Sequence, residues 1–194
     1  MIGSQRVITM NRSSHQQGFS LIEVLVTLVL VAIGVLGMVA LQGRSIQYTQ
    51  YSVQRNSAVM LVNDLTEIIR ANPEQLFDPA PTPSTPYYGE LKATSSFYKE
   101  EGDELPDVEA CVSMPKSGAE QLGCWVDAVE RELPGGESVF NDYAYICRSS
   151  TKGSCDGKGS MLEIQLAWQV KPGACPDSRA PTDTVCIYRT RVEL

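Results

Sequence analysis

The feature that most constrains this chain is an apolar run from Phe19 to Leu41 that contains a single charged side chain, Glu23. As an α-helix the run would span roughly 35 Å, enough to cross a bilayer core of about 30 Å. A carboxylate within hydrocarbon costs on the order of 2.5–3.5 kcal/mol even on the mildest scales. A segment that served only as an anchor would have no use for this charge, so Glu23 requires a second role.

The residues before the run form a basic leader. Residues 1–17 carry Arg6, Arg12 and His15 and no acidic residue. Basic residues before a membrane span hold the N-terminus in the cytoplasm, so the rest of the chain is expected on the far side of the membrane. An ordinary secretory signal has a shorter apolar core, about 7–15 residues, which precedes its cleavage site. Here Gly18 comes before the apolar run, so cleavage after Gly18 would remove the leader and keep the apolar segment.

The motif Gly-Phe-Ser-Leu-Ile-Glu at residues 18–23 resembles the class III signal of type IV pilins and secretion pseudopilins. The resemblance implies that a prepilin peptidase cuts the Gly18–Phe19 bond and that Phe19 becomes an N-methylated N-terminus. It also implies that Glu23 neutralises the N-terminal amine, usually of a neighbouring subunit, during assembly. Pairing would offset much of the cost of burying the two charges. A capping box between Ser20 and Glu23 is a second reading, and the two are compatible.

Composition narrows the possible functions. The chain has 194 residues, which suits one anchored domain rather than several. Its net charge of −7 becomes two units more negative without the leader, and this balance disfavours nucleic-acid binding. The one histidine, His15, lies in the leader, so the mature chain lacks the commonest general base and metal ligand. We therefore expect no catalytic residues, no cofactor and no metal site.

Six cysteines lie in the C-terminal part, which the leader places outside the cytoplasm. An even count in an oxidising compartment predicts three disulfides, and no Cys-x-x-Cys motif suggests a redox or zinc site. Six cysteines allow 15 pairings, among which sequence alone does not choose. We expect the sequential pairs because each closes a short loop: Cys111–Cys124, Cys147–Cys155 and Cys175–Cys186.

The helix is expected to continue beyond the apolar run, from about Phe19 to Ala71, and to end before Pro73. Its second half is amphipathic, with polar residues on its other faces, and should pack on a globular head. The apolar stripe comprises Ile46, Val53 and Met60, which recur every seven residues, and then Leu61, Leu65, Ile68 and Ile69.

Gly34, Gly37 and Gly43 interrupt the predicted helix. One reading is a bend or a close helix–helix contact in a filament core. The other is that glycine is simply common in membrane helices.

Two segments in the middle of the chain are expected to lack regular structure. Asp78–Pro86 is a proline-rich, semi-rigid linker. Lys99–Glu109 is acidic, and we expect a solvated loop there rather than a calcium site because the ordered ligand spacing of an EF-hand is absent.

The C-terminal part predicts one helix and three strands. Gly118–Leu133 reads as a short helix with Trp125 on its core face, stopped by residues 134–136. The predicted strands are Tyr143–Arg148, a half-buried Leu162–Val170 and Val185–Val192. They should form an antiparallel sheet whose apolar face covers the amphipathic helix.

The glycine-rich segment 153–159 resembles a phosphate loop only superficially. It lacks the required Gly-Lys-Ser/Thr spacing and precedes a strand rather than a helix, so we expect a tight turn closed by Cys147–Cys155. A Ser–Lys nucleophile pair is conceivable there, but nothing in the sequence supports one.

These elements predict an α+β fold: a long N-terminal transmembrane and amphipathic helix packed on a disulfide-bonded, antiparallel β-sheet head, as in type IV pilins. The expected organisation is a cleaved leader (1–18), a transmembrane helix half (19–41), an amphipathic helix half (42–72) and a periplasmic head with an αβ-loop (73–194).

Several segments at both ends resemble PilV-type minor pilins of Gram-negative type IV pili, namely residues 33–38, 41–43, 122–125, 142–150, 155–168 and 191–194. The resemblance implies a low-abundance subunit that joins other minor pilins in a complex that primes polymerisation of the major pilin. It also implies a pilus-tip adhesin and an inner-membrane assembly platform as partners, with roles in twitching motility and adhesion. The expected location is the inner membrane, single-pass with a periplasmic head, and then the pilus tip.

Three alternatives remain at this point. A type II secretion pseudopilin shares the N-terminal motif, although the disulfide-rich head and the C-terminal segments favour a pilus. A membrane-anchored periplasmic enzyme lacks support because no catalytic constellation is visible. A sugar- or protein-binding head on a plain anchor would need neither Gly18 nor Glu23.

Overall fold

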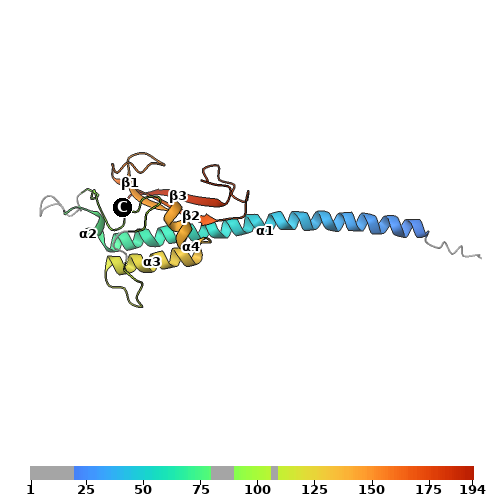
Figure 1. Ribbon diagram of the computed structural model, residues 1–194, viewed down its shortest axis with the longest axis horizontal. Helices are drawn as coiled ribbons and strands as arrows, with labels where there is room; N and C mark the ends of the chain where they lie inside the picture. Colours follow the sequence, from blue (N-terminus) through green and yellow to red (C-terminus); the bar gives the residue numbers. More distant parts are fainter. Residues whose placement is uncertain (1–19, 80–89, 106–108) are drawn as a thin grey trace, which may run out of the picture. The chain divides into compact units, whose positions relative to one another are not determined.

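The computed structural model describes residues 20–79, 90–105 and 109–194. The chain forms two compact units, residues 1–44 and 45–194, and we call the second the head. The elements follow in the order α1, α2, α3, α4, β1, β2, β3 (Figure 1). The architecture is the predicted α+β fold, with a long apolar N-terminal helix and an antiparallel three-stranded sheet.

Helix α1 (Leu21–Ala71) contributes to both units. The part in the first unit is exposed throughout the residues described. By length and composition α1 could span a membrane, and among residues 20–79, 90–105 and 109–194 it is the one helix that could do so. Its last residue is the predicted one, whereas Phe19, the predicted start, lies outside the described residues.

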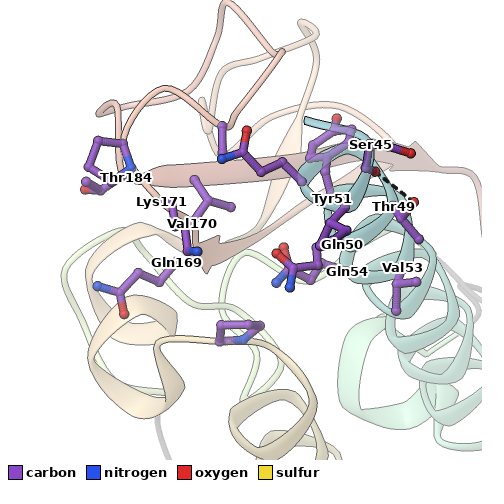
Figure 2. Close-up of a pocket in the computed structure, with 15 residues that line it drawn as sticks. Ser45, Thr49, Gln50, Tyr51, Val53, Gln54, Gln169, Val170, Lys171 and Thr184 are labelled. Carbon is purple, nitrogen blue, oxygen red and sulfur yellow. Dashed lines mark hydrogen bonds between the residues drawn. The ribbon is translucent and has the colours of Figure 1, made fainter. Parts of the chain in front are cut away.

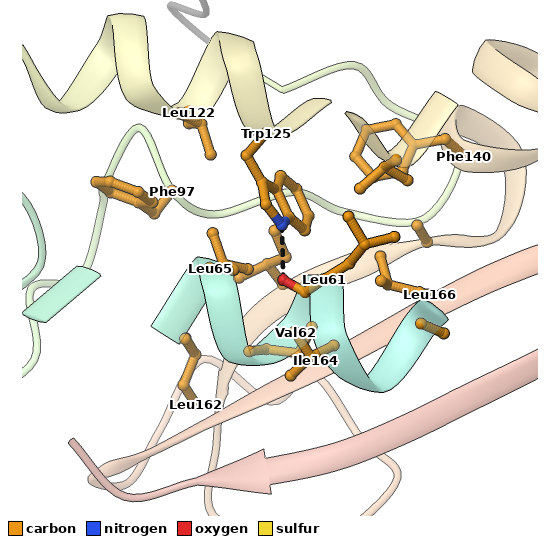
Figure 3. Packing of buried hydrophobic residues seen from close by; sticks show 14 of the residues in the cluster. Leu61, Val62, Leu65, Phe97, Leu122, Trp125, Phe140, Leu162, Ile164 and Leu166 are labelled. Atoms are coloured by element: carbon orange, nitrogen blue, oxygen red, sulfur yellow. Dashed lines mark hydrogen bonds between the residues drawn. The ribbon is translucent and has the colours of Figure 1, made fainter. Parts of the chain in front are cut away.

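The head is built on the second part of α1. Ala58, Leu61, Leu65 and Ile69 are at most 2% exposed, and their spacing of three or four residues places them on one helix face. Figure 1 shows the sheet on one side of this part of α1 and α3 on the other. Residues from α1, α3 and the sheet form one hydrophobic core (Figure 3).

Helix α3 (Gly118–Glu132) agrees with the predicted helix to within a residue. A capping box starts it: the Ser117 side chain accepts from the Glu120 backbone N–H, and the Glu120 side chain accepts from the Ser117 N–H. Trp125 is 3% exposed, which places it in the core as expected.

Two short helices correct the sequence analysis. Pro73 does not simply end a helix; it is the first residue of α2 (Pro73–Leu76), a position where the missing N–H of proline costs nothing. Helix α4 (Gly136–Tyr143) starts directly after α3, where residues 134–136 were expected to lead into a strand. Gly135 has φ +107°, a left-handed conformation that turns the chain and lets a new helix begin.

The strands are β1 (Tyr145–Ser149), β2 (Met161–Gln169) and β3 (Val185–Val192). They form an antiparallel sheet in the order β1–β2–β3, with Ile164 of the central strand opposite Ile146 and Thr190. The third strand has the predicted bounds, and the first begins two residues later than predicted because α4 occupies residues 136–143.

Strand β2 is buried on both faces, which corrects the predicted half-buried pattern. Glu163 is fully buried, and Gln165 and Ala167 are 3% exposed. Tyr143 of α4 packs beside Ala167, and its backbone carbonyl accepts from Gln165 Nε2 at 2.8 Å. The loop after β1 covers Glu163, whose Oε1 accepts from the Gly153 N–H at 2.6 Å.

Three disulfides brace the head. They join the sequential pairs expected above: Cys111 to Cys124, Cys147 to Cys155 and Cys175 to Cys186. The first fastens the loop before α3 to that helix, the second closes the loop after β1, and the third ties the β2–β3 connection to β3.

The two segments expected to be irregular are described only in part. Residues 80–86 of the proline-rich linker lie outside the described residues, but its flanks meet, since the Asp78 N–H donates to the Glu90 carbonyl at 2.9 Å. In the acidic segment, residues 100–104 are exposed in agreement with a solvated loop, and residues 106–108 lie outside the described part. Lys99, at its start, departs from this expectation because it is 1% exposed.

Candidate functional site

The predicted processing site is only partly in view. Gly18 and Phe19, the proposed cleavage and methylation residues, lie outside the described residues, as does the leader with His15. The structure begins at Ser20, whose carbonyl accepts from the backbone N–H groups of Glu23 at 3.0 Å and Val24 at 3.3 Å. Helix α1 therefore begins at Leu21, three residues after Gly18.

Glu23 lies in the first turn of α1 and is exposed. The two hydrogen bonds of the expected capping box with Ser20 are not formed, and no cation pairs with Glu23 among the residues that the structure describes. Its carboxylate is thus available to a positive group, and the start of a helix favours negative charge through the helix dipole.

The helix surface around Glu23 is apolar. Leu21, Ile22, Val24 and Leu25 are each 47–80% exposed, and no charged residue occurs from Val24 to Gly43. Exposure of this much contiguous apolar surface marks a membrane-facing or protein-facing segment. Glu23 is therefore a single carboxylate in surroundings that would exclude water once they are covered.

The part of α1 that belongs to the head also carries exposed apolar side chains. The apolar pattern in the sequence placed Ile46, Val53 and Met60 on the same stripe as Leu61, Leu65 and Ile69. That prediction was wrong for the first three residues, which are 58%, 59% and 65% exposed and do not join the core. Residues seven apart lie on nearly the same side of a helix, so these three form a separate exposed stripe.

The glycines of α1 have open space around them. A Cβ added at Gly34, Gly37 or Gly43 would meet no atom within 4 Å. No contact within the described chain requires glycine at these positions, so both readings of them remain: close contact with another helix, or the ordinary frequency of glycine in membrane helices.

The head has a pocket of about 770 Å³ between α1 and the end of β2 (Figure 2). Amide and hydroxyl side chains of Gln50, Gln54, Thr49 and Gln169 line it together with Tyr51. The buried Oε1 of Gln54 has no hydrogen-bond partner. The lining residues include no histidine, cysteine or acidic residue. Among the described residues, no group of histidine, cysteine or acidic side chains could hold a metal ion.

Two buried charged groups stabilise the head, and sequence patterns did not reveal either. Lys99 Nζ donates to the backbone carbonyls of Glu100, Asn141 and Ala144 at 3.0, 2.8 and 2.9 Å. Burial lowers the pKa of Lys99 to about 8, with nearby acidic side chains opposing part of that shift, so the ammonium group stays mostly charged at neutral pH.

The second group is Glu163, which lies between two arginines of β3. Its Oε1 is 3.8 Å from Arg189 Nε, and its Oε2 is 3.7 Å from Arg191 Nε. Burial raises the pKa of the neighbouring Tyr145 phenol to about 12. The alternation of charged and apolar residues along β2 and β3 was visible in the sequence. The burial of Glu163 by the loop after β1 could not be predicted from it.

Comparison with known families gives two matches. Residues 13–39 match the prokaryotic N-terminal methylation motif, and residues 40–122 match the model described as type IV pilin Tt1218. The first match includes Gly18, Phe19 and Glu23, and the second includes the amphipathic part of α1 and the start of α3. No curated protein and no solved structure matches the chain significantly.

Proposed function

Because the chain belongs to the type IV pilins, a family of structural proteins, we propose that it is a minor pilin that helps to start pilus polymerisation. In this role it joins other minor pilins in a complex at the pilus tip, beside an adhesin, and supports twitching motility and adhesion. The segments that resemble PilV-type minor pilins support this more specific assignment.

The proposal includes processing at the inner membrane. A prepilin peptidase cuts the Gly18–Phe19 bond on the cytoplasmic side, and the new N-terminus at Phe19 is methylated. The match of residues 13–39 to the N-terminal methylation motif supports this step. The single-pass chain then stands with its head in the periplasm, and the oxidising compartment accounts for the three disulfides.

The observation that carries the proposal is Glu23, an unpaired carboxylate on an otherwise uncharged, exposed helix surface. Within a membrane or a helix bundle, this charge is costly alone and is stabilised by an ammonium group. The N-terminal amine of an adjacent subunit is the cation that pilin assembly supplies. Docking then relieves two buried charges at once, so the assembled state is favoured over the free subunit.

Glu23→Ala tests this pairing. We expect normal membrane insertion and leader removal but a large loss of association with the other pilins of the same pilus. Breaking a buried ion pair costs about 3–5 kcal/mol, which corresponds to at least a hundredfold loss in association. Glu67→Ala is the matched control, because Glu67 lies on the same helix with its side chain 71% exposed, and its one ion pair within the described part of the chain is with Arg70.

The measurement is co-isolation of tagged protein with the other pilins from membranes, together with a count of surface pili. If Glu23→Ala loses co-isolation with the other pilins and surface pili, and Glu67→Ala keeps both, the result supports pairing of Glu23 with the N-terminal amine of an adjacent subunit. Equal co-isolation and normal piliation in Glu23→Ala would refute it. Co-isolation with secretion-system pseudopilins instead of pilus proteins would contradict the pilus assignment while preserving the role of Glu23.

A further inference from the structure

The pocket between α1 and the end of β2 has no part in the assembly role proposed above. Its volume of about 770 Å³ lies within the roughly 300–1,000 Å³ typical of small-ligand sites. Three segments of the head form its walls: residues 45–54 of α1, the α3–α4 turn at Pro134, and residues 169–174 together with Thr184 (Figure 2). The second and third walls are joined, because the Gln169 N–H donates to the Pro134 carbonyl at 2.6 Å.

Two carboxamide side chains of α1 enter this pocket. Figure 2 shows Gln50 and Gln54 directed from α1 towards the end of β2, and their spacing of four residues places them on one helix face. The Oε1 atom of Gln54 is buried without a hydrogen-bond partner. A buried acceptor of this kind normally has a donor, as Gln165 Oε1 has in Arg189 Nε at 2.9 Å. The pocket therefore contains an acceptor whose donor is missing.

The missing group narrows the chemistry of a ligand. It must offer an O–H or N–H donor, which a phosphate dianion or a carboxylate does not have. The carboxamide nitrogens beside it donate, so the ligand also needs acceptors, and a sugar hydroxyl is both donor and acceptor. Among the described residues that line the pocket, none is acidic and the one charged side chain, Lys171, is exposed. An uncharged, hydroxyl-rich ligand fits these groups best.

Apolar surface forms much of the remaining wall. Val53, Pro134 and Val170 line the pocket, and Val53 is 59% exposed. The ring of Tyr51 packs against the buried Trp168, with centroids 6.1 Å apart, which fixes the position of this part of the wall. Apolar and aromatic walls with a few polar groups are typical of small-ligand sites, and they can cover the C–H face of a sugar ring.

The backbone around the pocket is already paired, which disfavours an extended peptide as the ligand. The Gln169 N–H bonds to the Pro134 carbonyl, the Val170 N–H donates to the Thr184 carbonyl at 2.8 Å, and the Ala174 N–H donates to the Lys171 carbonyl at 2.9 Å. A peptide strand binds through free backbone groups at an edge. Recognition in this pocket therefore depends on side chains.

We propose that this pocket binds a neutral saccharide. Gln54 Oε1 accepts from a sugar hydroxyl, the Gln50 carboxamide donates to a sugar oxygen, and Val53 and Val170 contact the C–H face of the ring. Binding of a saccharide is a function additional to pilus assembly. It depends on the head alone and is independent of Glu23, so either proposal can fail without the other.

NMR titration of the side-chain carboxamide signals tests the site directly. The sample is the full-length protein in dodecylphosphocholine micelles, because detergents with sugar headgroups would compete. The probes are maltotriose and triacetylchitotriose, and we expect at least one to shift the Gln50 and Gln54 signals saturably, with a Kd of about 1 mM or lower. The signals of Gln121 and Gln165, which lie outside the pocket, should not move. No shift of Gln50 or Gln54 with either probe would overturn the proposal.

Inorganic phosphate is the comparison ligand, and it should give no saturable shift of the Gln54 signal because it cannot supply the missing donor. Binding of phosphate as tight as that of the better sugar would overturn the assignment to a neutral saccharide.

Gln54→Leu tests the part given to the unpaired acceptor. This variant should bind the sugar at least about tenfold more weakly than wild type. Its urea midpoint should stay the same or rise, because the oxygen that it removes has no partner in the described chain, so weaker binding would not reflect unfolding. Asn56→Leu is the matched control, since Asn56 is exposed on the same helix and does not line the pocket. Equal affinity of wild type and Gln54→Leu, or an equal loss in Asn56→Leu, would contradict the proposal.

Discussion

The indole N–H of Trp125 donates to the backbone carbonyl of Leu61 at 2.7 Å, joining α3 to α1 across 64 positions of sequence (Figure 3). Both residues are buried, so this bond satisfies a donor that would otherwise be costly inside the core. The ring of Trp125 also meets that of Phe140 edge to face, with centroids 6.0 Å apart. One side chain thus connects α1, α3 and α4.

Trp125→Phe should lower the free energy of unfolding of the head by about 2 kcal/mol, because the hydrogen bond is lost and the smaller ring leaves a void. Urea unfolding of the full chain in detergent, with disulfides intact, measures this change. Met114→Ala is the control: Met114 is 76% exposed and should change stability by less than about 0.5 kcal/mol. Equal stability of Trp125→Phe and wild type would show that the bond contributes nothing.

Lys99→Met should destabilise the head more strongly, by about 3 kcal/mol. Methionine fills a similar volume but leaves the carbonyls of Glu100, Asn141 and Ala144 without their shared donor. The same urea experiment applies, with Lys116→Met as the control at an exposed site. A stability equal to that of the wild type would mean that water replaces the ammonium group without loss.

Gly123→Ala should disturb the loop before α3. A Cβ at Gly123 would lie 1.8 Å from the Glu109 carbonyl oxygen, which is far inside van der Waals contact, so the loop carrying Cys111 would have to move. We expect slower formation of the Cys111–Cys124 disulfide and a loss of at least about 2 kcal/mol in stability. Thiol labelling during oxidative refolding measures the first effect. Asp127→Ala, an exposed change on the same helix, should behave as wild type.

Asp156 should contribute to the stability of the head at neutral pH, and this contribution should be lost in acid. Its carboxylate accepts from the Ser150 hydroxyl and from the backbone N–H groups of Ser150 at 3.0 Å and Lys158 at 2.9 Å. These bonds lower the pKa of Asp156 to about 2 from 3.8. A lowered pKa means that the folded state favours the ionised form, so the contribution is present above pH 3.8 and disappears as the pH falls towards 2. The urea midpoint of wild type should therefore fall more steeply over this range than that of Asp156→Ala; parallel slopes would contradict this.

Local patterns in the sequence predicted most of the elements. The end of α1 at Ala71 and both bounds of β3 were given by periodicity and turn residues, because those segments carry a clear apolar pattern. Helix α4 was missed because residues 134–136 read as a helix stop, whereas the left-handed Gly135 ends one helix and begins another.

Long-range burial could not be predicted in the same way. Lys99 and Glu163 are charged residues in polar stretches, and only the packing of α4 and of the loop after β1 buries them. The seven-residue spacing of Ile46, Val53 and Met60 was visible in the sequence. Their exposure could not be predicted, because it depends on which face of α1 the sheet covers. For Glu23 the sequence indicated a buried ion pair, and no partner for it occurs among the residues that the structure describes.

The most direct test of the account is the intact mass of the protein purified from membranes, measured with and without reductant. We expect the loss of residues 1–18, a gain of one methyl group and the return of six hydrogens on reduction, one pair for each disulfide. A chain that keeps its leader and has free thiols would contradict it, since neither a processed N-terminus at Phe19 nor an oxidised periplasmic head would then exist.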